Sequence, residues 1–400
     1  MVTDLRAPAA TGRVSAAVAA AGVSSFALLY APQAVLPQLA GAYELDPGSA
    51  SLTVGVATTA LALAVLPLAA LSEVVDRRKI IIWSVIGSAV LGLLLPLAPD
   101  YRVLLAMRAL QGVAIAGFPG VAAAYLADQV GAARLPAAVG AMIAGNSVGG
   151  MLGRLGAGFT AEPLGWQGAL LVVAGVSLAC AVFAAATLPR SARGGHAPGP
   201  GAHEPAGGWV RRLVVPYAVG ALGMGAFVAV YNAAGFRLTA PPLDLAPAVA
   251  SLVFLAYATG TVSSAAAGRL VDRLGRGPAL VAALVTTAAG AALTLPDRLP
   301  VMAAGFAVLT AGFFAAHAVA SAWVAAEAPP RARGRAAGLY TLCYYLGSGA
   351  GGTAGTAVYG HAGWTALVAL IAGWLLLALI AVLAALRRSP SRNPRATSAL

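Results

Sequence analysis

Long apolar segments, separated by short polar ones, run along the whole chain. Each is close to the roughly 20 residues that a helix needs to cross a bilayer, and none alternates in polarity as a barrel strand would. We therefore predict an all-α membrane protein with 12 transmembrane helices. The predicted helices cover residues 14–39, 51–71, 80–98, 103–126, 138–160, 167–188, 213–236, 247–268, 279–296, 299–326, 336–358 and 363–386.

The composition excludes a soluble protein. The 400 residues are 60% hydrophobic and 10% charged, whereas soluble domains carry roughly 25% charged residues. The net charge of +12 comes from short arginine clusters between the apolar segments. We interpret it as charge beside a membrane, with no nucleic-acid partner. Both cysteines, Cys180 and Cys343, fall inside apolar segments, so we expect no disulfide, metal site or cofactor.

The basic residues predict the orientation of the chain. Only Arg102, Arg237 and Arg298 fall in loops on one side, Arg108 and Arg154 fall inside predicted helices, and the rest of the 25 Lys and Arg lie on the other side. The positive-inside rule then places both termini in the cytoplasm, with the protein multi-pass in the cytoplasmic (inner) membrane. The first helix resembles a signal peptide but is long and soon followed by another, so we expect it to be retained.

Similar features recur at an offset of about 200 residues, which indicates an internal duplication. The segment "GNSVGGMLG" (145–153) matches "GSGAGGTAG" (347–355) at four glycines. Glycines four residues apart let helices approach closely. Two roles stay open for these glycine rows: tight helix packing, or a surface between two halves that forms and breaks.

The duplication predicts two six-helix pseudo-repeats. Residues 1–188 would form an N-terminal six-helix bundle, and residues 213–400 a C-terminal one with a short basic tail. The cytoplasmic segment 189–212 would join them, since its first 20 residues have the Pro/Gly-rich composition of a flexible linker. Two such bundles can rock about a central site and expose it to each side in turn.

Charge gathers in two loops about half a chain apart. Residues 268–277, "GRLVDRLGRG", resemble the charged motif between the second and third, and the eighth and ninth, helices of the major facilitator superfamily; residues 69–78 are a degraded copy. Arg108, Gln111 and Gly112 are similar to the fourth-helix R-x-x-Q-G motif of that family. The segments "GNSVGGMLGR", "YNAAGFRL", "LAYATGT", "AGFFAAHAVAS" and "LYTLCYYLGS" resemble the YnfM-type bacterial inner-membrane transporters.

The resemblance implies a secondary carrier, often an exporter driven by proton entry, and a monomer. It also implies that the acids of the charged loops latch the two halves together on the cytoplasmic side. The latch residues would be Glu73, Arg77, Arg78, Gly268, Asp272, Arg273 and Arg276. The alternative is that these side chains are solvated charges that set topology and contribute little to stability.

Two arginines inside predicted helices carry the clearest chemistry. An ionisable residue within the membrane is a functional-site candidate, and the planar fork of arginine suits a carboxylate or phosphate. With no acid inside the predicted helices, Arg108 and Arg154 favour an anionic or zwitterionic small-molecule substrate. Alternatively, each bonds backbone carbonyls or reaches an acid outside the membrane.

Other polar side chains complete a candidate cavity. His317 has an unperturbed pKa near physiological pH and is the candidate for proton coupling, although a buried histidine is often only a hydrogen-bonding residue. Pro32 predicts a kink and freed carbonyls in the first helix. With the two arginines and His317, the predicted cavity residues are Tyr30, Gln33, Gln111, Asn146, Tyr231, Asn232, Tyr257, Tyr340 and Tyr344.

The sequence thus predicts a secondary active transporter that moves a small organic solute by alternating access, as a proton-coupled exporter. An uncoupled facilitator or an anion exchanger is the alternative, because no acid lies within the predicted helices. An integral-membrane transferase is more distant, since it needs paired acids or a His–acid pair, and Asp128 and Glu327 lie singly at helix ends. We therefore expect that the protein is not an enzyme.

Overall fold

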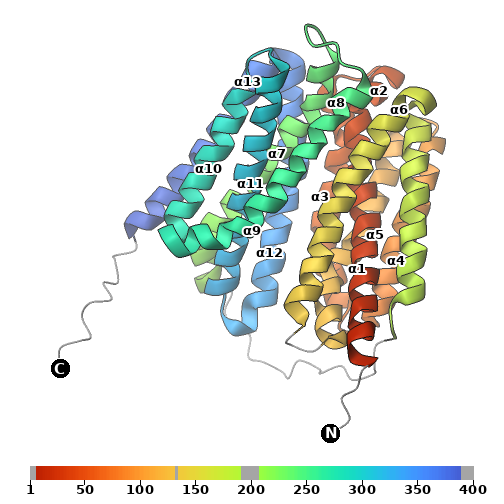
Figure 1. Ribbon diagram of the computed structural model, residues 1–400, viewed down its shortest axis with the longest axis vertical. Coiled ribbons are helices and arrows are strands. Elements are labelled where there is room, and N and C mark those ends of the chain that lie inside the picture. The colour runs from red at the N-terminus through yellow and green to blue at the C-terminus, as the bar shows by residue number, and fades with distance from the viewer. Residues whose placement is uncertain (1–5, 131–133, 191–206, 389–400) are drawn as a thin grey trace.

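The computed structural model describes residues 6–130, 134–190 and 207–388, and within them the regular structure is entirely helical. The centre of the predicted linker (191–206) and the basic tail (389–400) lie outside the described residues. Figure 1 shows the elements, in chain order α1 (Arg6–Tyr30), η1 (Ala31–Val35), α2 (Leu36–Ala42), α3 (Pro47–Leu71), α4 (Arg77–Leu94), η2 (Leu95–Leu97), α5 (Tyr101–Gln129), α6 (Leu135–Thr187), α7 (Gly207–Thr239), α8 (Pro247–Ser251), η3 (Leu252–Ala256), α9 (Tyr257–Leu274), α10 (Arg276–Leu293), α11 (Leu299–Glu327), η4 (Pro330–Ala332), α12 (Arg333–Leu346), η5 (Gly347–Gly351) and α13 (Gly352–Arg388).

Ten helical stretches of the described chain are long and apolar enough to cross a membrane. Two of these ten each contain a pair of the predicted helices. Helix α6 has 53 residues and leaves helical geometry at Gly165 (φ 67°), and α13 does so at Gly363 (φ 78°). Glycine adopts positive φ at little cost, so it is the residue that permits both bends. In Figure 1 the yellow and yellow-green parts of α6 meet at such a bend.

The two ends of the described chain lie at the same end of the molecule, and the bends in α6 and α13 lie at the opposite end (Figure 1). We call these the terminal end and the far end. We call α1 to α6, with η1 and η2, the N-terminal group, and α7 to α13, with η3 to η5, the C-terminal group. The N-terminal group, coloured red to yellow-green, lies beside the C-terminal group, coloured green to blue (Figure 1).

Acidic residues start three of the helices. Asp46 accepts a hydrogen bond from the Ser49 N–H at 3.0 Å, and Asp76 and Asp100 cap α4 and α5 in the same way. A capping carboxylate satisfies one of the free N–H groups at a helix start and suits the positive end of the helix dipole. The bonds from Ser49 also hold the pKa of Asp46 below its usual value. These three acids therefore serve the starts of helices.

The outer surface of the helices is as apolar as the interior. Leu63, Trp83, Val176 and Val262 are each at least 60% exposed, and many other large apolar side chains are exposed with them. A soluble protein rarely exposes so large an apolar surface, whereas lipid chains cover it without cost. Burial of apolar area therefore does not hold these helices together, and close packing and polar contacts must.

Both glycine rows pack within a group. A Cβ atom on Gly149 would lie 2.5 Å from the backbone oxygen of Val23, so α6 touches the backbone of α1. Gly145 meets the backbone of Ala19 in α1, and Gly347 meets the backbone of Ala221 in α7, at the offset of 202 residues seen in the sequence. The four matched glycines of each row thus serve tight packing within a group, whereas Gly349 of the second segment faces α3 of the other group.

A different set of glycines joins the two groups. Gly55 of α3 lies against Thr353 of α13 and the Gly349 carbonyl of η5, and Gly158 of α6 lies against Ser251 of α8. Gly235 of α7 contacts the proline ring at position 37 in α2. These contacts place α2, α3 and the first part of α6 against the C-terminal group.

Gly149→Ala should lower the free energy of unfolding by about 1–3 kcal/mol, because the added methyl group meets backbone that cannot move aside. Gly175→Ala on the same helix is the matched control, since a Cβ there has nothing within 4 Å. That variant should be neutral or stabilise by up to about 1 kcal/mol through helix propensity. Unfolding in a detergent titration, followed by circular dichroism, measures both. Equal midpoints for the two variants would contradict the packing described.

Candidate functional site

Arg154 is the polar centre of the contact between the groups. It lies on α6 and its side chain is only 1% exposed. Its Nε donates to Gln33 Oε1 at 2.5 Å, and its Nη1 donates to the Gly150 carbonyl at 2.8 Å. Among the described residues Nη2 has no hydrogen-bond acceptor, and no acid forms an ion pair with this arginine. The guanidinium is therefore a buried charge without a counter-charge.

Three aromatic rings surround this guanidinium. Its carbon lies 4.1 Å from the ring centroid of Tyr30, 4.5 Å from that of Tyr257 and 5.4 Å from that of Phe254. Tyr30 belongs to α1, whereas Phe254 and Tyr257 belong to η3 and α9. Each cation–π contact out of water stabilises the charge by about 2 kcal/mol or more, which offsets much of the cost of burying it but supplies no counter-charge. The rings come from both groups, so the charge lies where the groups meet.

An amide pair continues this network across the boundary. Gln33 Nε2 donates to Asn232 Oδ1 at 2.6 Å, which links η1 of the N-terminal group to α7 of the C-terminal group. The Nδ2 of Asn232 and the Oγ of Ser348 are buried without a partner in the part of the chain that is described. Arg154, Gln33 and Asn232 thus form a hydrogen-bonded chain that connects the groups and ends in an unused donor.

Arg108 lies in a different place, inside the N-terminal group. An α-helix would bond the Leu28 carbonyl to the N–H of residue 32, but Pro32 has none. Arg108 Nη1 donates to that carbonyl at 3.1 Å, Nη2 donates to the Leu29 carbonyl at 2.7 Å, and Nε donates to the Thr53 carbonyl at 2.8 Å. The kink expected at Pro32 is present as η1, and Arg108 satisfies the carbonyls that it frees. Of the two roles considered from the sequence, carbonyl binding is the one observed, and this fully buried side chain does not face the contact between the groups.

Gln111 belongs to the same internal network. Its Oε1 accepts from Arg108, and its Nε2 donates to the Ser88 carbonyl of α4 at 2.9 Å. Both of its polar groups are satisfied within the N-terminal group, so it too lies away from the boundary. The R-x-x-Q-G segment therefore ties α1, α3, α4 and α5 together.

Aromatic side chains pack densely on the C-terminal side of the network. The Tyr231 hydroxyl bonds Thr310 Oγ1 at 2.7 Å, and its ring centroid lies 5.2 Å from that of Tyr257. Phe227 stacks on Phe313 with 4.1 Å between centroids. Tyr231 is therefore joined to the Arg154 site through Tyr257. We call the packed rings of Phe227, Tyr231, Tyr257 and Phe313 the aromatic wall.

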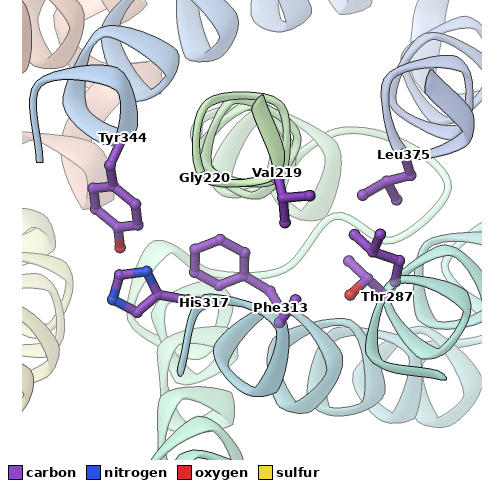
Figure 2. Close-up of a pocket in the computed structure, with 10 residues that line it drawn as sticks. Val219, Gly220, Thr287, Phe313, His317, Tyr344 and Leu375 are labelled. Atoms are coloured by element: carbon purple, nitrogen blue, oxygen red, sulfur yellow. The ribbon is translucent and has the colours of Figure 1, made fainter. Parts of the chain in front are cut away.

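His317 lies in a small pocket within the C-terminal group (Figure 2). Its Nδ1 bonds the Tyr340 hydroxyl at 2.8 Å, and its ring centroid is 4.6 Å from that of Tyr344. Figure 2 shows His317 and Tyr344 together on one side of the pocket and Thr287 on the other. In the described chain no carboxylate forms an ion pair with His317. The histidine, Tyr340 and Tyr344 form a hydrogen-bonding and stacking cluster next to the aromatic wall.

The first charged loop makes its contacts within the N-terminal group. Arg77 forms an ion pair with Asp128, and Arg78 Nε donates to the Leu188 carbonyl at 2.8 Å. Glu73 is exposed, and within the described ranges it has no ion-pair partner. These contacts hold α4 to the ends of α5 and α6.

The charged residues of the second charged loop are exposed. Arg276 lies 3.8 Å from Glu327, a pair within the C-terminal group. Gly268, Asp272 and Arg273 are exposed, and in the part of the structure described no ion pair joins Asp272 to a basic side chain. In this conformation neither charged loop bridges the two groups.

Two residues of the site had no prominent signal in the sequence. Phe254 lies within an apolar run, and only its spacing of three from Tyr257 suggests that both rings share a helix face. Ser348 lies inside a glycine-rich segment that folds as a π-helical turn, a geometry that often marks functional sites. Asn146, which was expected in the cavity, packs against Gly22 of α1, and its Oδ1 has no partner in the described chain.

Comparison with known proteins decides the family. The model of the Major Facilitator Superfamily matches residues 17–240 and 222–399. This chain belongs to the major facilitator superfamily. It is 34% identical over 382 residues to the uncharacterized MFS-type transporter YybF of Bacillus subtilis (strain 168), with 92% of each chain covered. It is 35% identical over 376 residues to the inner membrane transport protein YnfM of Escherichia coli (strain K12), covering 92% of this chain and 89% of YnfM.

Solved structures agree on the fold. A bacterial homolog of the human lysosomal transporter Spinster, in an inward-facing and occupied conformation, superposes with a TM-score of 0.77 at 16% identity, over 94% of this chain and 98% of the homolog. The resemblance to YnfM-like transporters of this superfamily is thereby confirmed, and the chain is a multi-pass membrane transporter rather than an enzyme.

Arg108→Leu should lower the free energy of unfolding by about 3 kcal/mol or more, because each buried carbonyl left without a donor costs about 1–3 kcal/mol. Arg102→Leu, six residues earlier on α5 and exposed, is the control and should stay within about 0.5 kcal/mol of the parent. Detergent-titration unfolding of the three proteins measures the difference. If Arg108→Leu unfolds at the parental midpoint, the structural role assigned to Arg108 is wrong.

Proposed function

We propose that this transporter exports a small organic solute, anionic or zwitterionic, across the cytoplasmic membrane by alternating access coupled to proton entry. The chain crosses the membrane 12 times, with α6 and the unit from α12 to α13 each bent into two crossings. Both termini face the cytoplasm, and the protein acts as a monomer. The solute binds where the two groups meet.

The observation that carries this proposal is the buried Arg154, whose guanidinium is in contact with aromatic rings from both groups. A site shared by two rocking bundles is exposed to whichever side opens. Gln33 and Tyr30 on one side and Asn232 and Tyr257 on the other surround the charge. A solute in contact with these side chains would touch both groups at once, as alternating access requires.

The contacts between the groups support a state that is closed at the far end, and Leu66 of α3 against Gly338 of α12 adds a contact nearer the terminal end. Gly158 with Ser251 and Gly235 with Pro37 join segments that lie towards the far end, near the labels α2, α6 and α8 in Figure 1. With the termini in the cytoplasm, the far end is the outside. In the opposite state, Asp272 and Glu73 would reach basic partners in the other group and latch the cytoplasmic side; both are exposed and unpaired within the described chain here.

Proton coupling rests on His317, which lies within the membrane-spanning helix α11. It contacts Tyr340 and Tyr344. A row of ring contacts through Phe313 and Phe227 connects it to Tyr257 of the Arg154 site. An uncoupled facilitator or an anion exchanger is the second candidate. It is favoured by the fact that no carboxylate in the described chain pairs with either His317 or Arg154.

Proteoliposomes that contain an internal pH dye test both parts. A panel of anionic, zwitterionic and cationic solutes should give proton movement with an anion or zwitterion only. His317→Gln, which keeps a hydrogen bond but cannot carry a proton, should lose proton movement by at least about tenfold while some solute flux remains. His361→Gln is the matched control, because His361 is exposed.

Solute flux without any proton movement in the parent protein would remove the coupling and leave the facilitator or exchanger. Proton movement that survives unchanged in His317→Gln would assign the coupling to another group. Proton movement driven by cations alone would contradict the proposed substrate class.

A further inference from the structure

We infer that the Arg154 site holds one carboxylate of its ligand, and that this carboxylate replaces Gln33 as the acceptor of the Arg154 Nε–H. The inference rests on the proposed function only in taking this ligand to be the transported solute. It adds to the transport proposal the chemical group that is bound and the roles of Gln33, Asn232 and Ser348 in binding it.

Charge is the first step. Arg154 is 1% exposed, and among the described residues it has no acidic partner. Desolvating a guanidinium costs several kcal/mol, and the aromatic rings that offset this cost carry no negative charge. Buried charges in proteins are otherwise paired. The described residues therefore provide no counter-charge for Arg154, and an anionic ligand would supply one.

The available hydrogen-bond groups are the second step. Arg154 Nη2 has no acceptor in the described chain, and Asn232 Nδ2 is a buried donor without one. Ser348, whose Oγ is also buried without a partner, lies beside Tyr30. An arginine and an amide offer only N–H groups here, so the complementary ligand is an acceptor. A carboxylate has two oxygens and takes the planar fork of arginine through both.

Gln33 is the third step. The Nε–H and Nη2 groups of a guanidinium form the side-on fork that a carboxylate grips, and in this structure Gln33 Oε1 occupies the Nε–H position at 2.5 Å. A neutral amide oxygen is a weaker acceptor than a carboxylate, because charge-assisted bonds are about twice as strong. Gln33 thus occupies the position that one ligand oxygen would take. The rings of Tyr30, Phe254 and Tyr257 favour an apolar or aromatic body beyond the carboxylate.

Isothermal titration of the purified full-length protein in detergent tests this directly. The probes are benzoate, phenylacetate and hexanoate, each paired with its own amide, which has the same shape without the charge. At least one carboxylate should bind at least about tenfold more tightly than its amide. That preference should vanish in Arg154→Gln and stay in Arg102→Gln, whose arginine is exposed.

Variants at Gln33 separate ligand binding from a structural role. Gln33→Glu is nearly isosteric and places a fixed carboxylate on Arg154, so it should abolish carboxylate binding although the arginine and the fold are kept. Gln33→Leu removes the competing oxygen, so carboxylate affinity should rise by at least about threefold. A purely structural Gln33 predicts no rise in affinity. These two variants also keep the test valid if Arg154→Gln does not fold.

The inference is overturned if no carboxylate is preferred over its amide, or if the preference persists in Gln33→Glu. It is also overturned if Gln33→Leu binds carboxylates no more tightly than the parent. Binding in detergent needs no gradient, so the outcome is independent of the transport assay. Carboxylate binding at Arg154 without flux in proteoliposomes would support the site and refute export. Flux of a non-carboxylate alone would support export and refute the carboxylate site.

Discussion

The structure depends on one constraint: inside a bilayer every backbone polar group must find its partner within the protein. Helices meet this constraint wherever they are regular, and each interruption needs a side chain to complete it. Pro32 interrupts α1, and Arg108 supplies the donors that the freed carbonyls of Leu28 and Leu29 require. The kink is thereby fixed in place. It turns η1 so that Gln33, one helical turn after Tyr30, lies against α7 of the other group.

The two buried arginines show where inference from sequence stops. Both lie inside predicted helices, and the sequence offered each the same two roles. The residues about 200 positions later, Val308 and Thr356, are uncharged. Arg108 satisfies carbonyls of residues 55 to 80 positions away, and Arg154 meets an amide 121 positions away. Those partners are set by how helices pack, and packing in lipid follows small residues and close approach rather than a hydrophobic pattern. Local patterns cannot distinguish the two arginines.

More of the fold than of the site could be predicted. The length of the apolar segments and the short loops between them predicted the helices, because the thickness of the bilayer sets the length of a spanning helix. The sequence also pointed to Tyr30, Gln33, Asn232 and Tyr257, since polar and aromatic residues stand out in apolar helices. It missed Phe254, because a phenylalanine in an apolar run does not differ in polarity from its neighbours. It also left open which helices the glycine rows join, because the spacing of four identifies a close contact but not the partner.

The location of the Arg154 charge relates the packing to the motion. Its rings come from α1 on one side and from η3 and α9 on the other, so any movement that separates the groups removes rings from one face of the guanidinium. The same movement stretches the bond between Gln33 and Asn232. Without a counter-charge, the separated state would leave the cation with fewer partners than it has now, at a cost that grows with its burial. An anion that stays on Arg154 through the movement removes most of this cost. Ligand binding would therefore favour reorientation of the loaded carrier over that of the empty one, by electrostatics alone.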